Sequence, residues 1–166
     1  WSHDGPGLYQ ARLPGDSFRF RLDREDLPFP EICDLAVRDN ARRRFLFVSC
    51  VLGRHWPVRP AVLREIAARL AEKVAVRTRG EPAIFIGMAE TATTLGQAVF
   101  REWKRAGREG FYIESTRRAT GGPIALRFSE SHSHATAHLI HLPAQKDDPR
   151  AWLSRAGHVA IIDDEA

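Results

Sequence analysis

The chain has only two cysteines, Cys33 and Cys50, among 166 residues. A disulfide framework is therefore not expected, and Cys50 lies in an apolar run where a buried, reduced thiol is common. The sequence also lacks any apolar run near the roughly 20 residues that span a bilayer, and its amino terminus does not have the pattern of a signal peptide. We therefore expect a soluble cytoplasmic protein with no membrane partner.

The composition fits one compact domain, because 43% of the residues are hydrophobic, which is enough for a sizeable core at this length. The net charge of +4 and the pI near 9.6 suit phosphate-rich small molecules as well as nucleic acid. The basic residues do not cluster on one helix, and the aromatic residues are not interleaved with them. We therefore do not expect nucleic acid as a partner, and a homodimer is one option for the assembly.

The first 30 residues differ from the rest of the chain. They contain repeated Gly and Pro around one alternating stretch, residues 18–22. This pattern predicts an irregular N-terminal arm over residues 1–30 with one edge strand. A single domain over residues 31–166 is expected to follow.

Beyond the arm the sequence alternates between predicted strands and predicted helices. Residues 45–51 and 83–86 are short apolar runs of strand length, and residues 158–162 form a third, which we expect to be buried. Pro60 begins the first intervening helix, and Gly107 is placed to end the second. The apolar helix faces contain Val62, Ile66, Leu70 and Val74 in the first helix and Leu95, Val99 and Trp103 in the second.

A polar, hairpin-like insert is predicted before the last strand. Its strands are residues 111–114, 124–128 and 135–142, and a short helix around Trp152 and Leu153 follows. Three apolar strands separated by helices predict an α/β fold with a parallel sheet covered on both faces. Ligands of such sheets bind at the carboxyl ends of the strands.

Three loops would then lie along one edge of the sheet. They are Arg54–His55, Ala89–Thr91 and the pair Asp163 and Asp164. The adjacent carboxylates of the pair repel each other, so their position is costly unless a ligand uses the charges. A ribose 2,3-diol with an associated Mg²⁺ is a suitable ligand, because carboxylates accept hydrogen bonds from hydroxyls and bind hard cations. The alternative is a solvated strand end or an exposed tail.

The last eight residues, VAIIDDEA, resemble the first half of the type I phosphoribosyltransferase signature, which is an apolar strand, two acidic residues and a small-residue phosphate loop. The second half binds the 5-phosphate of 5-phosphoribosyl-1-diphosphate (PRPP) with backbone amides at a helix start. The resemblance therefore implies a type I fold that is truncated inside its PRPP loop, with the rest expected after Ala166.

Four further segments extend the resemblance over residues 45–166, to the phosphoribosyltransferases of bacterial tellurite-resistance and stress-response gene clusters. These segments are residues 52–58, 86–96, 114–118 and 128–135. The resemblance implies transfer of a 5-phosphoribosyl group from Mg²⁺-bound PRPP to a nitrogenous base, with release of pyrophosphate. The alternative is a non-catalytic regulator that binds PRPP or a nucleotide, because a fold does not determine a function.

By this resemblance, residues 87–94 correspond to the loop that holds pyrophosphate. Its binding residues would be Gly87, Met88, Ala89, Glu90 and Thr91. Small residues let backbone amides approach anionic oxygens, and a helix amino terminus follows. Glu90 departs from a purely anion-binding loop, and it either orients a metal-bound water or caps the helix. A wholly structural turn is the alternative for this loop.

Arg117 and Arg118 lie beside Gly121 and Gly122, in a segment that the type I fold uses as a mobile cover over PRPP. Both arginines are candidates to bind the leaving pyrophosphate and to neutralise its charge, with Arg117 also assigned to catalysis. Ordinary surface arginines beside a hairpin turn are the alternative.

His132 and His134 alternate onto one strand face, which His138 extends, while His141 falls on the other face. Zinc sites normally take four ligands at spaced turns, and no cysteine is near, so a dedicated zinc site is not favoured. We expect His132 and His134 to donate protons or hydrogen bonds to the diphosphate or the base, and the other two histidines to be structural.

Arg54, His55 and Trp56 follow the first predicted strand and precede Pro57. The indole of Trp56 is suited to stacking on a flat ring, so these residues are candidates for contact with the base or with a phosphate. The alternative is a helix-entry turn that contains a partly buried tryptophan.

Overall fold

The computed structural model describes residues 1–3, 5, 7–14, 16–40, 44–54, 56–129, 136–142 and 149–164. The chain divides into two compact units, residues 1–59 and residues 60–166, and each is described by itself. The expected boundary between residues 30 and 31 stays a prediction. In the described part of the chain, every helix is too short or too polar to cross a bilayer.

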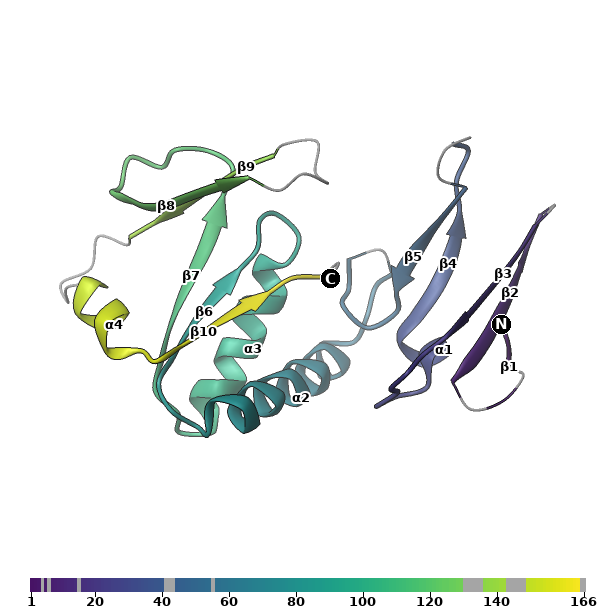
Figure 1. Ribbon diagram of the computed structural model, residues 1–166, viewed down its shortest axis with the longest axis horizontal. Helices are drawn as coiled ribbons and strands as arrows, with labels where there is room; N and C mark the ends of the chain where they lie inside the picture. The colour runs from purple at the N-terminus through teal and green to yellow at the C-terminus, as the bar shows by residue number, and fades with distance from the viewer. Residues whose placement is uncertain are drawn as a thin grey trace. The chain divides into compact units, whose positions relative to one another are not determined.

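The first unit consists of two antiparallel sheets and a short helix (Figure 1). Their bounds are β1 (Ser2–His3), β2 (Leu8–Leu13), β3 (Asp16–Arg21), α1 (Phe29–Ile32), β4 (Cys33–Val37) and β5 (Phe45–Ser49). Strands β1, β2 and β3 form one sheet in that order, and β4 pairs with β5. Strand β3 corresponds to the expected edge strand. Strands β1 and β2 were not predicted, because the Gly and Pro residues around them indicated an irregular arm.

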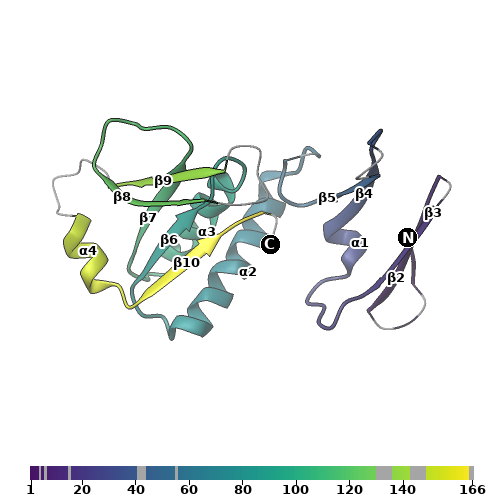
Figure 2. The same cartoon turned by 45° about the horizontal axis from the view of Figure 1, so that its top comes forward.

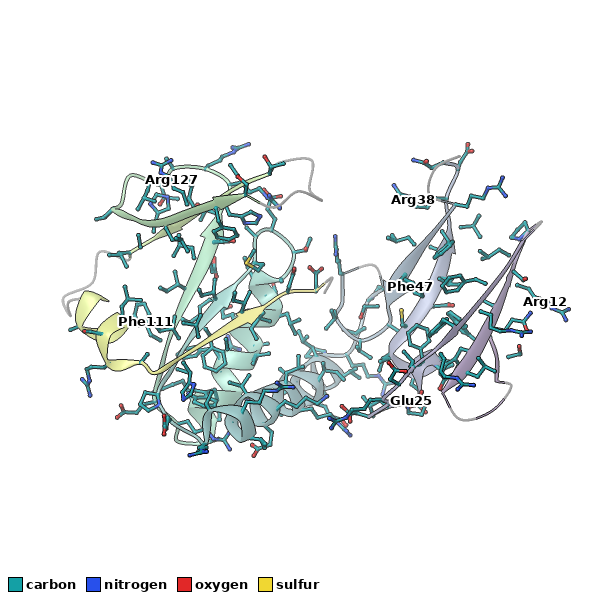
Figure 3. The ribbon with its side chains drawn as sticks, in the orientation of Figure 1. Arg12, Glu25, Arg38, Phe47, Phe111 and Arg127 are labelled. Atoms are coloured by element: carbon teal, nitrogen blue, oxygen red, sulfur yellow. The ribbon has the colours of Figure 1, made fainter. Side chains whose placement is uncertain are left out.

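The first unit contains a cluster of partly exposed phenylalanines, whereas its buried hydrophobic residues, among those described, are Tyr9, Ala11 and Val48. The ring centroids of Phe20 and Phe29 lie 4.8 Å apart, and those of Phe18 and Phe45 lie 4.9 Å apart. Phe47, which Figure 3 labels, contacts the rings of these same four residues. On β3 the phenylalanines alternate with exposed arginines, so this strand interleaves aromatic and basic residues, and the expectation that they are not interleaved is wrong here.

The second unit is built on a mixed five-stranded sheet with the order β10-β6-β7-β9-β8. Its strands are β6 (Ala83–Gly87), β7 (Gly110–Thr116), β8 (Ile124–Ser129), β9 (Ala137–His141) and β10 (His158–Ile162). Strands β10, β6 and β7 are parallel, while β9 is antiparallel to both β7 and β8. The α/β class is as expected, but the sheet is not wholly parallel.

Two strand predictions were wrong. Residues 45–51 were assigned to the parallel sheet, but β5 pairs antiparallel with β4. Residues 111–114 were assigned to the insert, but they belong to β7, which lies between β6 and β9. Both errors have one cause: an apolar run reveals burial, whereas pairing direction depends on the connection, since parallel neighbours need a long crossover and antiparallel ones do not.

Helices α2 (Pro60–Thr78) and α3 (Thr93–Arg105) lie on one side of the sheet, and α4 (Pro149–Arg155) lies beside the start of β10 (Figures 1 and 2). Helix α3 packs against β6 and β7, and α2 packs against α3. The expected face of α3 is confirmed, because Leu95, Val99 and Trp103 are buried. The expected end is confirmed too, since Gly107 has a φ of +74° just after the helix.

The buried face of α2 is one position away from the expected face. Its buried residues are Ala67, Ala71, Ala75 and Thr78, whereas the larger Val62, Ile66, Leu70 and Val74 are half-buried beside them. Small side chains at the contact let two helix axes approach closely, so alanines occupy the centre of the contact with α3.

The other face of the sheet is aliphatic. Ile84, Ile113 and Ile140 are buried there and pack with Phe111, which Figure 3 labels. Strand β10 contributes Val159 and Ile161 to this face, and their side chains are 59% and 66% exposed. Strand β10 lies where the sequence predicts a strand. However, the prediction that this strand is buried was wrong for the face with Val159 and Ile161, which no described residue covers fully.

Candidate functional site

The carboxyl ends of β6, β7 and β10 meet at one edge of the second unit. Gly87 at the end of β6 lies opposite Ile162 of β10 on one side and Glu114 of β7 on the other. The segments that leave these strands therefore begin side by side. The structure thus brings together the loop after β6 and the pair of aspartates after β10, as the sequence predicts.

The loop Met88–Ala92, called here the β6 loop, is held by hydrogen bonds from both neighbouring strands. The backbone N–H of Met88 donates to the carbonyl of Ile162 at 3.0 Å. The N–H of Ala89 donates to Oγ of Ser115 at 2.8 Å, and Nη2 of Arg117 donates to the carbonyl of Ala89 at 3.2 Å. These three hydrogen bonds fix the loop backbone at its first two residues, Met88 and Ala89. The peptide bond between Ala89 and Glu90 is cis.

A side-chain hydrogen bond links the β6 loop to the aspartates. Oγ1 of Thr91 donates to Oδ1 of Asp164 at 2.8 Å, although the two residues are 73 positions apart in the sequence. The N–H of Asp164 donates to Oδ1 of Asp163 at 2.8 Å, and Asp163 is exposed. The carboxylates and the threonine hydroxyl form an oxygen-rich donor set of the kind that hard cations such as Mg²⁺ prefer.

The amino terminus of α3 points into the same region. Its N-cap residue is Ala92, which has no side chain able to cap the helix. The described residues offer no hydrogen-bond acceptor to the backbone N–H groups of Glu90 and Thr91. Such amides, together with the helix dipole, attract anions. Glu90 is exposed and lies two residues before the N-cap residue Ala92. It is therefore not the residue that caps the helix in this structure.

Two glycines and a tyrosine set the distance between α3 and β6. A Cβ at Gly87 would overlap the hydroxyl of Tyr112, and a Cβ at Gly96 would lie 2.9 Å from the Cα of Gly87. Oη of Tyr112 donates to the carbonyl of Thr93 at 2.7 Å. Burial, and then the nearby carboxylate of Glu114, raise the pKa of Tyr112. The start of α3 is therefore held against the strand end.

The two arginines differ in position. Arg117 is half-buried and directed at the β6 loop through its bond to Ala89, whereas Arg118 is exposed and its carbonyl accepts a hydrogen bond from Oγ1 of Thr116 at 2.8 Å. Arg117 thus lies within the candidate site. Binding of pyrophosphate by either arginine stays a prediction.

The histidines fall into two groups. His132 and His134 lie outside the described residues, so their expected roles stay predictions. His138 is fully buried, with Nδ1 3.1 Å from Oγ of Ser115, and Nδ1 of His141 lies 3.0 Å from the carbonyl of Gly122. Among the described residues, no group of three or more His, Cys, Asp or Glu side chains is arranged to hold a metal ion.

The sequence pattern did not predict a site role for Ser115 or His138. The sequence feature that could have identified them is their polarity, because they interrupt apolar rows of β7 and β9.

The base-contact residues Arg54 and Trp56 lie in the first unit, after β5, where both are exposed, and His55 lies outside the described residues. Their contact with a base stays a prediction.

Comparison with protein families gives a match that agrees with this geometry. A family model described as phosphoribosyl transferase matches residues 32–166. Comparison with curated proteins gave no match, and neither did comparison with solved structures. The matched range contains β4, β5 and all of the second unit, including the β6 loop, Arg117 and the two aspartates. This chain therefore belongs to the phosphoribosyl transferase family.

Proposed function

We propose that this protein transfers the 5-phosphoribosyl group of PRPP, bound with Mg²⁺, to a ring nitrogen of a base and releases pyrophosphate. The observation that carries the proposal is the hydrogen bond between Thr91 and Asp164. It joins a carboxylate pair suited to ribose hydroxyls with a loop suited to pyrophosphate, since two of the loop's amides have no acceptor in the part of the chain that the structure describes. A phosphoribosyl diphosphate presents these two groups on adjacent atoms.

The aspartates would hold the ribose. Carboxylate oxygens of Asp163 and Asp164 accept hydrogen bonds from the 2- and 3-hydroxyls, which offsets the repulsion between the two charges. The same oxygens would hold Mg²⁺, which supplies positive charge next to the pyrophosphate and the ribose hydroxyls.

The β6 loop and the arginines would hold the pyrophosphate. The N–H groups of Glu90 and Thr91 donate to its oxygens at the amino terminus of α3, where the helix dipole adds favourable potential. Arg117 already lies against this loop, and Arg118 follows it in the chain. Glu90 is assigned to orienting a water bound to the metal, since it does not cap the helix.

In the proposed reaction, the bond between C1 of the ribose and the pyrophosphate oxygen breaks, and its electron pair leaves with pyrophosphate. The base nitrogen forms the new bond to C1 and releases its proton. The transition state resembles an oxocarbenium ion, and fixed donors around the departing oxygens stabilise the negative charge that develops there. His132 and His134 are proposed as donors to the diphosphate or the base, and Arg54, His55 and Trp56 as contacts of the base.

The resemblance to tellurite-resistance and stress-response proteins, and the cytoplasmic location, remain parts of this proposal. The second role left open by the sequence is regulation through PRPP binding without turnover. Both roles share the ligand and differ in the fate of its C1–O bond. Measuring binding and turnover on the same preparation therefore separates them.

The test is an assay of the full-length protein with PRPP, Mg²⁺ and a panel of nitrogenous bases. We expect pyrophosphate and a nucleotide to appear in equal amounts with at least one base. Arg117→Gln should lower kcat/KM by about 100-fold, because it removes a donor to the leaving group. The matched control is Arg127→Gln, an exposed arginine on β8 (Figure 3), which should leave kcat/KM unchanged.

Two outcomes would contradict the proposal. Binding of PRPP without pyrophosphate release for any base would favour the regulatory role. Absence of PRPP binding would exclude both roles for this site.

A further inference from the structure

We propose that Ser115 and His138 are positioning residues that hold the β6 loop in the geometry that binds pyrophosphate. This inference rests on the proposed function, because it concerns the loop assigned to pyrophosphate. The two side chains act through the backbone of Ala89 and connect that loop to strands β8 and β9.

The two residues interrupt apolar rows at the site edge of the sheet. On β7, Ser115 follows Ile113 on the same face, and both are almost fully buried. On β9, His138 precedes Ile140 on the same face, and the His138 side chain is 0% exposed. Because Ser115 pairs directly with Ile140, His138 is its diagonal neighbour across the strands. Buried polar groups are costly unless they are hydrogen-bonded, so these two require a specific arrangement.

The hydrogen bonds lead from β9 to the loop. Oγ of Ser115 lies 3.1 Å from Nδ1 of His138 and accepts the N–H of Ala89 at 2.8 Å. A hydroxyl has one hydrogen and two lone pairs, so a lone pair remains for the Ala89 amide with either tautomer of the imidazole. Linked hydrogen bonds in a buried site also strengthen one another.

The orientation of His138 is itself fixed. Its ring stacks on Phe128 of β8, with centroids 4.8 Å apart and an angle of 8° between the planes. Phe128 and His138 are direct partners in the β8–β9 register. Stacking within the β8–β9 hairpin therefore fixes the imidazole. The imidazole is hydrogen-bonded to the serine hydroxyl, which in turn accepts the Ala89 N–H.

This arrangement matters because Ser115 accepts the Ala89 amide, while the amides of Glu90 and Thr91 have no acceptor among the described residues. Fixing the first part of the turn would keep the N–H groups of Glu90 and Thr91 available before the ligand arrives. Such pre-organisation raises affinity, since less conformational freedom is lost on binding. It also predicts that a ligand on the β6 loop steadies the β8–β9 hairpin.

The experiment compares two variants that have the same shape but differ in the hydroxyl. Ser115→Thr retains the acceptor, and Ser115→Val removes it. Inorganic pyrophosphate with Mg²⁺ is titrated into full-length protein by calorimetry. We expect affinity close to wild type for Ser115→Thr and about tenfold weaker affinity for Ser115→Val, the equivalent of one hydrogen bond. His138→Asn, which keeps an acceptor near the position of Nδ1, should lose less affinity than His138→Leu.

A control and a second readout separate positioning from general stability. Thr78→Val removes another buried hydroxyl, which bonds to the Val74 carbonyl within α2, and it should leave pyrophosphate affinity unchanged. Hydrogen exchange should show that pyrophosphate protects the β8 and β9 amides in wild type and in Ser115→Thr. Ser115→Val should lose this protection. If the valine variant does not fold, Ser115→Ala is used in its place.

The outcomes distinguish two failures. If wild type does not bind magnesium pyrophosphate, the proposed function and this inference are both overturned. If wild type binds it, but the valine and threonine variants bind equally well with equal protection of β8 and β9, only the positioning role is overturned.

Discussion

Strands β6 and β10 are parallel neighbours in the same sheet, yet their surroundings differ. On β6, Ile84 is 4% exposed and Phe85 is fully buried against Trp103 and α3. On β10, Val159 lies directly opposite Ile84 but is 59% exposed. Both strands end at the candidate site, so one half of the site stands on a packed core strand and the other half on an open strand.

The difference matches the chemistry of the two halves. The β6 loop would bind anions through backbone amides, which must be held in place to act together, and packing on both faces of β6 supplies that rigidity. Asp163 and Asp164 carry like charges, whose repulsion is weaker where water can reach them. A hydrated strand end therefore suits the acidic half better than a buried one.

The largest expected effect separates the two strands by stability. Ile84→Ala should lower the free energy of unfolding of the second unit by about 2–5 kcal/mol, because it leaves a cavity in the aliphatic core. Val159→Ala, at the paired position on β10, should change it by about 0.5 kcal/mol or less. Denaturant titration measures both, and equal losses would contradict the contrast between the strands.

A smaller effect is expected where α3 meets β6. Gly96→Ala places a Cβ 2.9 Å from the backbone of Gly87, so the helix must shift. We expect a loss of about 1–3 kcal/mol in the free energy of unfolding, together with weaker pyrophosphate binding, because the start of α3 moves. The control is Gln97→Ala, at the next and exposed position of the same helix. A Gly96→Ala protein as stable as this control would show that the close approach is unimportant.

The smallest effect concerns Tyr112 on β7, which bonds to the start of α3. Tyr112→Phe removes the hydrogen bond to the Thr93 carbonyl and should lower the free energy of unfolding by about 1 kcal/mol at neutral pH. The pKa of Tyr112 is raised above its ordinary value of 10.0, so the unfolded chain loses this proton first as the pH rises. The tyrosine's contribution is therefore complete below pH 10.0 and declines above it.

Stability curves of both proteins across this pH range provide the measurement. The wild type should lose stability above pH 10.0 more steeply than Tyr112→Phe. Tyr9, whose pKa is also raised, is present in both proteins and so does not affect the difference. Parallel curves would contradict the assigned environment of Tyr112.

The sequence predicted best those features that depend on local periodicity. The buried residues Leu95, Val99 and Trp103 recur on one face of α3, so their spacing alone was sufficient. The β6 loop and the aspartate pair were also predictable, because both directly follow apolar strands, and parallel strands end at the same edge.

The features that were missed depend on pairing between distant segments. The run at residues 45–51 is as apolar as β6, and nothing in its pattern distinguishes an antiparallel partner from a parallel one. The contact of Ser115 with His138 arises from the β7–β9 register across 23 positions of sequence. Likewise, alanines rather than larger residues form the buried face of α2 because α3 approaches closely, which the helix period does not specify.

If the ends of β6 and β10 together form a PRPP site, calorimetric titration of the full-length protein with PRPP and Mg²⁺ should show binding by wild type. Combining Asp163→Asn with Asp164→Asn should weaken that binding by much more than tenfold, or about 1.4 kcal/mol. Circular dichroism should show an unchanged fold, and Asp23→Asn, at an exposed position of the first unit, should bind as wild type does. Unchanged PRPP affinity in the double variant would show that the two aspartates do not bind PRPP and are an ordinary solvated strand end.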